Sequence, residues 1–329
     1  MAINILQPKV SKLSNTMEGQ QILVYGSNST GKSYQGSKLK DVLFLPFENG
    51  IRTLNGVEFF PVNSWKDFRE INKALTDPKT IDEVKKKYKS IVFDEVYTAA
   101  RYLIDYVCKL HGADSIREGN NGFGLWSELE TEWFQQIDKL MKAGFLVYFV
   151  GHTEIDKNTN QIVPKGDKRT MQFIRDNADI VAYLKSNGVD ENGKVIPSSA
   201  YLAETPEFFA RSRYTHIDPF IPEFSAENLE KAVNEAIKRQ EEADGVKSIS
   251  REEQVQLFES EKQNFEEVLA EVNELGGKVA NAGHLEELLK LVKKHLGEKK
   301  VADAQPADLD LVYLLLLDVR DLVSEKGLN

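Results

Sequence analysis

The stretch that most constrains this chain is a glycine-bounded loop between a strand pattern and a helix pattern. The apolar run Ile22–Tyr25 leads into the loop Gly26–Ser33, and a short helical pattern begins at Lys32. The loop reads Gly-x-x-x-x-Gly-Lys-Ser, whose glycines permit a tight turn that points backbone N–H groups at a phosphate chain. The pattern predicts a nucleoside triphosphate site formed by Gly26, Ser27, Asn28, Ser29, Thr30, Gly31, Lys32, Ser33 and Tyr34.

A second apolar run ends in two carboxylates. The segment 89–93 precedes Asp94 and Glu95, about 60 residues after the loop. On a strand beside the loop strand, Asp94 is expected to join the shell of a Mg²⁺ ion whose other protein ligand is the Ser33 hydroxyl. Lys32 is expected to reach the β- and γ-phosphates. Glu95 is expected either to polarise water or to cap the following helix.

Two more apolar runs end in polar residues. The run 42–47 leads into Glu48, and the continuous run 145–151 leads into His152. Since the carboxyl ends of parallel strands face the ligand in open α/β sheets, His152 is interpreted as a γ-phosphate sensor. The alternative is a histidine whose hydrogen bonds are satisfied within a turn.

Three later segments offer cations or an unusual loop. Residues 111–124 form a glycine-rich loop that is long for a connector, which indicates function. The polar segment 154–170 is predicted to be a hairpin, and its cations either form a solvated face or contact nucleic acid. Arg211 and Arg213 are interpreted as arginine fingers for a neighbouring subunit or as members of surface ion pairs. The candidate nucleic-acid contacts are Arg117, Lys157, Lys165, Lys168 and Arg169.

Length and charge suggest two parts. The 329 residues favour about two domains. Residues 1–225 carry 28 Lys and Arg against 29 Asp and Glu, whereas residues 226–329 carry 14 against 23. The predicted division is an N-terminal arm (1–20), an ATPase core (21–220) and an acidic helical region (221–329). An acidic total of −10 argues against indiscriminate coating of nucleic acid.

The remaining expectations concern location and secondary structure. A single cysteine, Cys108, excludes an internal disulfide framework. The first residues lack a signal pattern and no apolar run is long enough to span a bilayer, so a soluble, cytoplasmic protein is expected. Further strands are predicted at 57–62 and 214–217. A helix is predicted over 252–275, ended by Gly276 and Gly277.

The order of these motifs resembles that of the RecA-like ATPases. A loop strand, a strand ending in Glu48, a strand ending in Asp94 and a strand ending in His152 follow one another over about residues 20–220. In detail the chain resembles the compact RecA-like ATPases of bacteriophages that are linked to single-strand annealing and recombination. The resemblance implies that Glu48 activates the attacking water. His152 stands where the recombinases usually have a glutamine sensor.

The same resemblance implies partners. Loops 111–124 and 153–170 fall where that class contacts DNA, and Arg211 and Arg213 fall where it has intersubunit basic residues. The expected fold is α/β, a RecA-like P-loop core with a mainly parallel sheet between helices, followed by an all-helical C-terminal region. The expected function is that of a Mg²⁺- and ATP-dependent enzyme that binds single-stranded DNA and self-associates in a bacterial host's cytoplasm.

Three alternatives stay open at the level of sequence. A nucleotide or small-molecule kinase is less favoured, because the 153–170 segment is mostly lysine where a kinase lid is usually rich in arginine. A ring helicase or helicase loader shares the motifs. A nucleotide-gated adaptor would use its acidic C-terminal helices to bind a partner protein.

Overall fold

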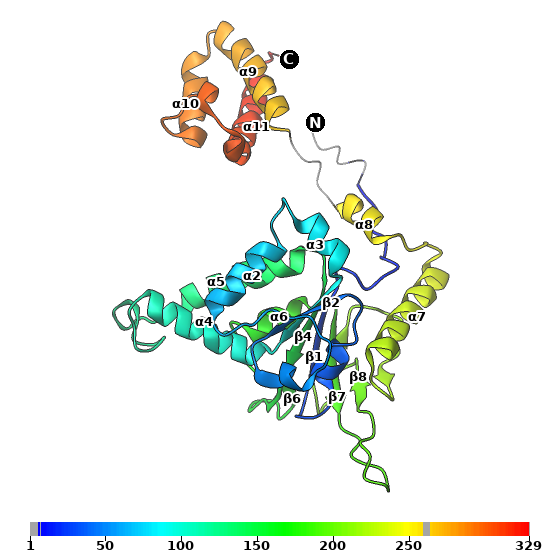
Figure 1. The fold of residues 1–329 in the computed structure, drawn as a ribbon. Coiled ribbons are helices and arrows are strands. Elements are labelled where there is room, and N and C mark those ends of the chain that lie inside the picture. Colours follow the sequence, from blue (N-terminus) through cyan, green and yellow to red (C-terminus); the bar gives the residue numbers. More distant parts are fainter. Residues whose placement is uncertain (1–5, 7, 259–263, 329) are drawn as a thin grey trace. The chain divides into compact units, whose positions relative to one another are not determined.

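The chain divides into two compact units. The computed structural model describes residues 6, 8–258 and 264–328. The units comprise residues 1–257 and 258–329, and each builds its own core (Figure 1). The boundary expected at residues 220–221 falls inside the first unit, because α7 (Ala226–Asp244) buries Leu229, Val233 and Ile237 in a core of that unit.

The first unit is organised around a mainly parallel sheet, which confirms the α/β fold class. Its strand order is β10-β8-β7-β1-β4-β3-β2, with β9 paired to β7. Its parallel strands are β1 (Gln21–Gly26), β2 (Val42–Pro46), β3 (Ser90–Asp94), β4 (Leu146–Gly151) and β7 (Ile180–Lys185). The antiparallel strands are β8 (Ser199–Tyr201), β9 (Arg211–Ser212) and β10 (Phe220–Ile221).

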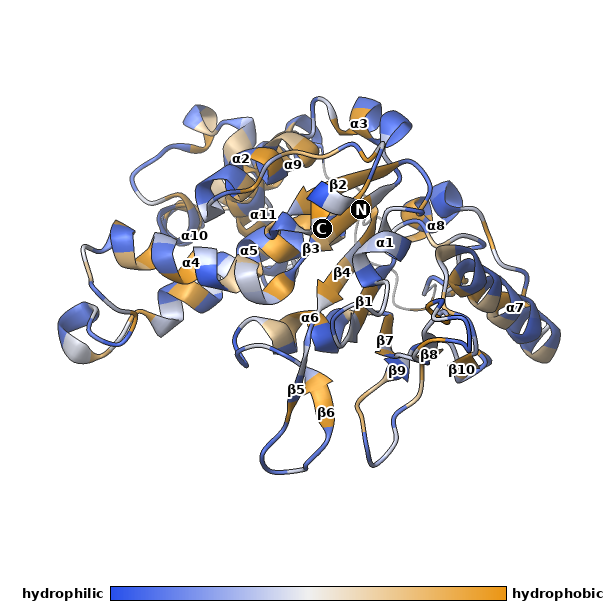
Figure 2. Cartoon of the chain, turned by 60° about the horizontal axis from the view of Figure 1, so that its bottom comes forward, coloured by the Kyte–Doolittle hydropathy of each residue, from blue (hydrophilic) through white to orange (hydrophobic). Residues whose placement is uncertain are grey.

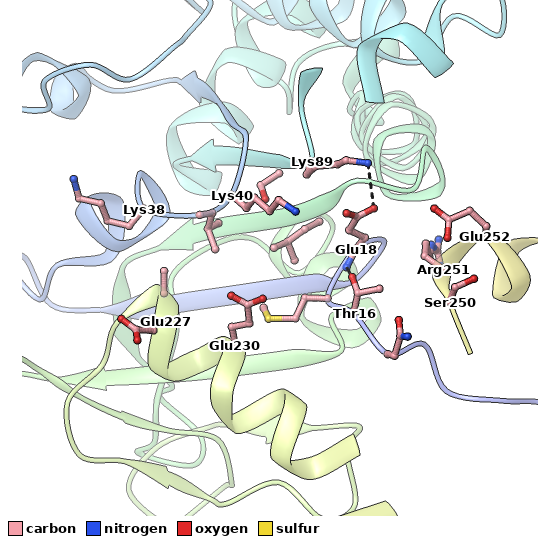
Figure 3. Close-up of a pocket in the computed structure, with 16 residues that line it drawn as sticks. Thr16, Glu18, Lys38, Lys40, Lys89, Glu227, Glu230, Ser250, Arg251 and Glu252 are labelled. Carbon is pink, nitrogen blue, oxygen red and sulfur yellow. Dashed lines mark hydrogen bonds and ion pairs between the residues drawn. The ribbon is translucent and has the colours of Figure 1, made fainter. Parts of the chain in front are cut away.

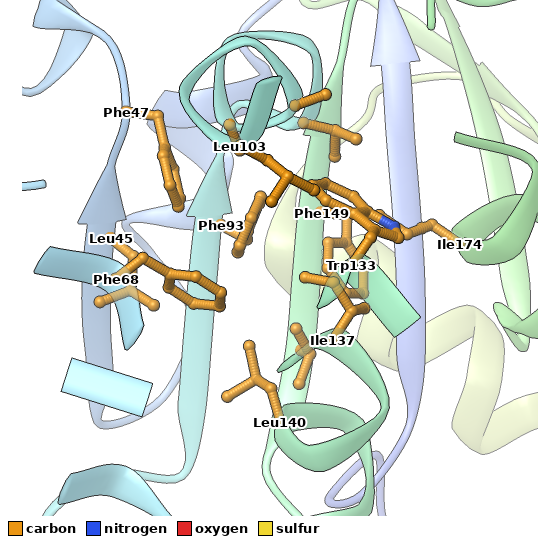
Figure 4. Close-up of a cluster of buried hydrophobic side chains, with 14 of the residues drawn as sticks. Leu45, Phe47, Phe68, Phe93, Leu103, Trp133, Ile137, Leu140, Phe149 and Ile174 are labelled. Atoms are coloured by element: carbon orange, nitrogen blue, oxygen red, sulfur yellow. The ribbon is translucent and has the colours of Figure 1, made fainter. Parts of the chain in front are cut away.

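Helices cover both faces of this sheet. Successive side chains of β1 alternate between two cores, with Leu23 and Tyr25 in one and Ile22 and Val24 in the other. The first core also takes aromatic and aliphatic side chains from the helices, as Figure 4 shows. Most side chains of the central parallel strands are therefore apolar, whereas the helices carry polar residues on their outer faces (Figure 2). The helices of this unit are α1 (Lys32–Gly36), α2 (Trp65–Leu75), α3 (Ile81–Lys87), α4 (Val96–Leu110), α5 (Trp126–Lys142), α6 (Met171–Asn177), α7 and α8 (Arg251–Phe258).

Two predicted strands are wrong. Residues 57–62 form only an isolated bridge, in which Phe59 lies beside Phe44 of β2. Pro61 has no N–H to extend that ladder. Residues 214–217 form a turn, closed by the Ile217 N–H donating to the Tyr214 carbonyl.

The strand of Asp94 is not the neighbour of the P-loop strand. β4 lies between β1 and β3 and pairs with both in parallel. All six residues of β4 are buried, as a strand at the centre of a two-sided sheet requires. His152, which follows β4, is thereby placed between the loop after β1 and Asp94 at the end of β3.

The described residues of the second unit form a bundle of three α-helices. These are α9 (Phe265–Asn281), α10 (Leu285–Leu296) and α11 (Leu309–Glu325). The predicted break at Gly276 and Gly277 is wrong, because α9 continues through both residues. A Cβ at Gly276 would lie 3.5 Å from the Leu288 side chain of α10, which is an ordinary van der Waals contact, so Gly276 is a helix residue that packs beside α10. The predicted helix 252–275 corresponds to α8 and α9, and residues 259–263 lie outside the described residues.

No helix in the described parts of the chain combines the length and the apolar character that crossing a bilayer demands.

Candidate active site

A pocket at the carboxyl edge of the parallel strands gathers most of the residues that the sequence predicts to bind nucleotide and catalyse hydrolysis; Gly26, Ser27 and Glu95 do not line it. It has a volume of about 220 Å³. The loop after β1 forms one wall, and residues that follow β2, β3 and β4 form the other. Its lining residues are Asn28, Ser29, Thr30, Gly31, Lys32, Ser33, Tyr34, Glu48, Asp94, Val150 and His152.

The loop has the backbone that phosphate binding needs. Gly31 has φ 86° and Ser29 has φ 63°, both in the left-handed region. At Gly26 a Cβ would lie 2.7 Å from the Leu184 carbonyl oxygen, so only glycine allows β1 and β7 to pass so closely here. The Thr30 hydroxyl donates to the Ser27 carbonyl at 2.9 Å and closes the loop on itself.

Lys32 is a buried cation at the base of the loop. Its side chain is 6% exposed, and its Nζ donates to the carbonyls of Gly26 at 3.0 Å and Ser27 at 2.7 Å. Burial lowers the pKa of Lys32, and the nearby carboxylates oppose that shift. The buried Tyr148 hydroxyl of β4 donates to the Lys32 carbonyl at 3.1 Å, so the central strand supports the first residue of α1.

Asp94 is a buried acid at the end of β3. Burial raises its pKa to about 6, and the Ser33 side chain acts in the opposite direction. Two further carboxylates, Glu48 and Glu95, also contribute to this rise. Three acids therefore surround Lys32. This excess of carboxyl groups over cations suits a site that accepts a divalent cation. The Ser33 hydroxyl and the Asp94 carboxylate are oxygen donors of the kind that Mg²⁺ prefers.

Glu48 and His152 form the opposite wall. The Glu48 side chain is 41% exposed, and its Oε2 lies 3.9 Å from His152 Nε2. Thr98 Oγ1 lies 3.1 Å from Glu48 Oε1. The interaction with His152 is the main cause that lowers the pKa of Glu48, and the Thr98 hydroxyl adds to it. At neutral pH Glu48 is therefore an ionised carboxylate facing the pocket.

Glu95 caps a helix. It is the N-cap of α4, accepting hydrogen bonds from the N–H groups of Tyr97 at 3.0 Å and Thr98 at 2.8 Å. Its exposed fraction is 1%, and it does not line the pocket. Burial raises its pKa and these hydrogen bonds oppose the rise. Of the two roles that the sequence left open for Glu95, this geometry matches the cap.

The segment after His152 is a hairpin, as the sequence predicted. It consists of β5 (Thr153–Ile155) and β6 (Ile162–Pro164), and the Lys165 N–H donates to the His152 carbonyl at 2.8 Å. Lys165 Nζ lies 4.0 Å from the centre of the Tyr97 ring, and the Arg169 guanidinium lies 4.5 Å from the Trp126 ring. Side chains that remain exposed in this hairpin and in the 111–124 loop include Lys157, Lys168 and Arg117.

Arg211 and Arg213 lie away from the pocket of their own chain. β9 pairs with Ile180 and Val181, at the amino end of β7, whereas the pocket lies at the carboxyl end of the sheet. The Arg211 guanidinium donates to the carbonyls of Asp176 and Ala178. Arg213 pairs with the Asp179 carboxylate at 3.5 Å.

A larger hollow lies at the amino edge of the sheet. Its volume is about 410 Å³, and it reaches the first residues of β3 and β4. Figure 3 shows Lys38, Lys40 and Lys89 along one wall and Glu227 and Glu230 along the other. Because it lacks the phosphate loop and balances its charges internally, its size alone does not make it the nucleotide site.

Two residues that contact the pocket's residues from outside it, Tyr148 and Thr98, carry no signal in the sequence for those contacts. Tyr148 is one apolar-strand residue among several, so no local pattern singles it out. Thr98 stands three positions after Glu95, a spacing that hints at a shared helix cap but not at a contact with Glu48.

This combination of phosphate loop, buried lysine and strand-end aspartate defines a P-loop ATPase domain. The model of the AAA domain family (AAA_24) matches residues 18–214, which is more than half of the chain. The chain belongs to this family, and the P-loop ATPase class expected from the sequence is confirmed. The chain is 46% identical over 326 residues to the "SPbeta prophage-derived uncharacterized protein YorG" of Bacillus subtilis (strain 168), covering 99% of this chain and 100% of that protein.

Proposed function

We propose that this protein is a Mg²⁺-dependent ATPase that binds single-stranded DNA and acts in the recombination or annealing of phage-type DNA. The observation that carries the hydrolytic part is the convergence of Lys32, Asp94 and Glu48 on one pocket. The buried Lys32 neutralises phosphate charge, and the ionised Glu48 carboxylate lies beside the position of the attacking water.

Each residue has a distinct task in this scheme. Lys32 leaves the loop carbonyls and binds the β- and γ-phosphate oxygens, while the loop N–H groups hold the remaining charge. Ser33 and Asp94 would hold Mg²⁺, which would supply charge neutralisation on the phosphates. Glu48 accepts a proton from water as its oxygen bonds to the γ-phosphorus. The bond to the bridging oxygen breaks and ADP leaves with that electron pair.

Contact with DNA is proposed for the hairpin and the neighbouring loop. The hairpin begins directly after His152. A shift of the hairpin on binding a DNA strand would therefore move His152, which lines the pocket. Its exposed lysines suit a phosphate backbone, whose recognition is dominated by charge. The prophage origin in the relative's name supports a role in phage DNA metabolism.

Self-association with ATP at the junctions is also part of the proposal. Arg211 and Arg213 lie at the edge of the sheet opposite the pocket. This position is compatible with an arginine finger that acts on the nucleotide of a neighbouring subunit. Both already bond to residues 176–179, so such a role requires them to exchange those bonds for phosphate oxygens.

The test is steady-state ATP hydrolysis with Mg²⁺, with and without single-stranded DNA, at two salt concentrations. We expect hydrolysis that DNA stimulates and that added salt suppresses. Lys157→Ala with Lys168→Ala should lose the stimulation and keep the basal rate, and the exposed pair Lys73→Ala with Lys79→Ala on the first unit serves as the matched control. A hydrolysis rate that does not change with DNA would contradict the proposed DNA binding but not the proposed ATPase activity.

The second unit favours an additional adaptor role. It has its own core and leaves leucines exposed on α10 and α11, among them Leu285, Leu289 and Leu314. Removing residues 259–329 keeps α7 and the whole of α8 with the first unit. If hydrolysis persists and binding to another protein is lost, the second unit serves as an adaptor.

A further inference from the structure

The hydroxyl of Thr98 lies between two carboxylates at the edge of the pocket. Its Oγ1 is 3.1 Å from Glu48 Oε1 and 2.7 Å from Glu95 Oε1. Thr98 belongs to the first turn of α4 and does not itself line the pocket. One side chain therefore connects the cap of a helix to the acid that faces the attacking water.

The two carboxylates differ in how firmly they are held. Glu95 is buried and accepts two backbone N–H groups of its own helix. Glu48 is half exposed and stands in the segment between β2 and a short 3₁₀ turn (Asn49–Thr53), with no side-chain capping bond to that turn. Glu95 is thus a fixed anchor, while the orientation of Glu48 depends on contacts with other elements.

A hydroxyl carries one proton, so Thr98 donates to one carboxylate at a time. Glu95 Oε1 also accepts the Thr98 N–H at 2.8 Å and can release the hydroxyl proton without becoming unpaired. In the described parts of the chain, Thr98 is the hydroxyl within hydrogen-bond distance of Glu48. The shorter contact with Glu95 therefore holds the Thr98 oxygen at the helix cap. Rotation of the O–H bond is enough for the hydroxyl to donate to Glu48 instead.

We infer that Thr98 is a positioning residue for hydrolysis: its hydroxyl holds Glu48 in the orientation that receives the proton of the attacking water. The inference rests on the proposed function, because it concerns the rate of the same reaction. Small displacements of a reacting group cost up to about 10²-fold in rate. Loss of the hydroxyl should therefore slow turnover roughly 10- to 100-fold and leave the KM for ATP unchanged, since Thr98 does not line the pocket.

The experiment compares Thr98→Val, which keeps the shape, with Thr98→Ser, which keeps the hydroxyl. We expect Thr98→Val to lower kcat and Thr98→Ser to restore most of it. Thr53→Val is the matched control, because the exposed Thr53 hydroxyl donates to the Gly50 carbonyl near Glu48. Equal kcat in Thr98→Val and wild type would overturn the inference, and so would a loss that Thr98→Ser fails to restore.

A double variant separates positioning from a structural effect. If Thr98 acts through Glu48, adding Thr98→Val to Glu48→Gln should cause no further loss of kcat. Losses that multiply would show that Thr98 acts through folding instead. A crystal structure of Thr98→Val gives a readout that needs no turnover: an unmoved Glu48 carboxylate would refute the inference. A wild-type protein without hydrolysis would contradict the proposed function itself.

Discussion

The two walls of the pocket are held in different ways. On the phosphate side, Lys32 and Asp94 are 6% and 4% exposed and are fixed by their own loop and strand. On the water side, the side chains of Glu48 and His152 are 41% and 29% exposed, lie 3.9 Å apart, and are oriented by contacts between separate elements. Binding thus depends on local sequence, whereas hydrolysis depends on how β2, β4 and α4 are brought together. The substitutions below test that division.

The largest effect is expected on the phosphate side. Lys32→Ala removes the buried cation of the loop, and hydrolysis should fall by roughly 10³-fold or more, to the limit of detection. ATP binding should weaken as well, because the lysine meets the bound phosphates. Turnover and equilibrium binding of a fluorescent ATP analogue measure the two losses. Lys73→Ala is the control, since this lysine is exposed on α2 and does not line the pocket. Undiminished turnover in Lys32→Ala would refute the P-loop assignment.

On the water side, substitutions should change kcat without changing ATP binding. Glu48→Gln removes the proposed general base but keeps the size of the side chain, so kcat should fall about 10²-fold while ATP binding persists. Glu95→Gln disturbs the α4 cap and should chiefly lower the melting temperature. Single-turnover hydrolysis and thermal unfolding of both variants distinguish the roles. A loss of rate in Glu95→Gln as large as in Glu48→Gln would move the base to Glu95.

Asp94 links the phosphate side to pH. Its folded-state pKa of about 6 lies above the usual 3.8, so between those values the folded chain holds a proton that the unfolded chain releases. The free energy of unfolding contributed by Asp94 therefore falls as pH rises through this window and is constant above it. The ionised form is the one that would hold the Mg²⁺ proposed for this site, so Mg²⁺-dependent ATP binding should weaken about tenfold from pH 7 to pH 5.

Asp94→Asn isolates this effect. In metal- and nucleotide-free protein it should raise the melting temperature at pH 7.5 relative to wild type, because a buried charge is removed. The two proteins should converge at pH 4, where Asp94 is protonated. Thermal unfolding at both pH values measures the difference. A variant less stable than wild type at pH 7.5 would show that the Asp94 carboxylate stabilises the fold.

The same division explains what the sequence could predict. The phosphate side was predictable because the loop, Lys32 and Asp94 are encoded in contiguous motifs, and buried strands have a plain apolar pattern. The position of β4 between β1 and β3 was not predictable locally, since strand order is set by packing across the sheet. Thr98 and Tyr148 act through contacts that join residues 50 and 116 positions apart. The strand predicted at 57–62 failed because its ladder ends near Pro61.

The smallest effect is expected for a substitution in β4. It tests whether the phosphate loop depends on residues outside its own sequence motif. Tyr148→Phe removes the hydroxyl that donates to the Lys32 carbonyl, while the ring still packs beside Gly36, where a Cβ would lie 3.1 Å from it. The loss should cost about 1 kcal/mol of stability and raise the KM for ATP a few-fold, because Lys32 loses support from β4. Tyr25→Phe is the matched control: its buried hydroxyl bonds to the carbonyls of Ile162 and Phe209, away from the loop. If both variants lose stability and only Tyr148→Phe changes KM, the central strand tunes the phosphate side. Equal KM in the two variants would leave the loop as a self-contained element, dependent on its own sequence alone.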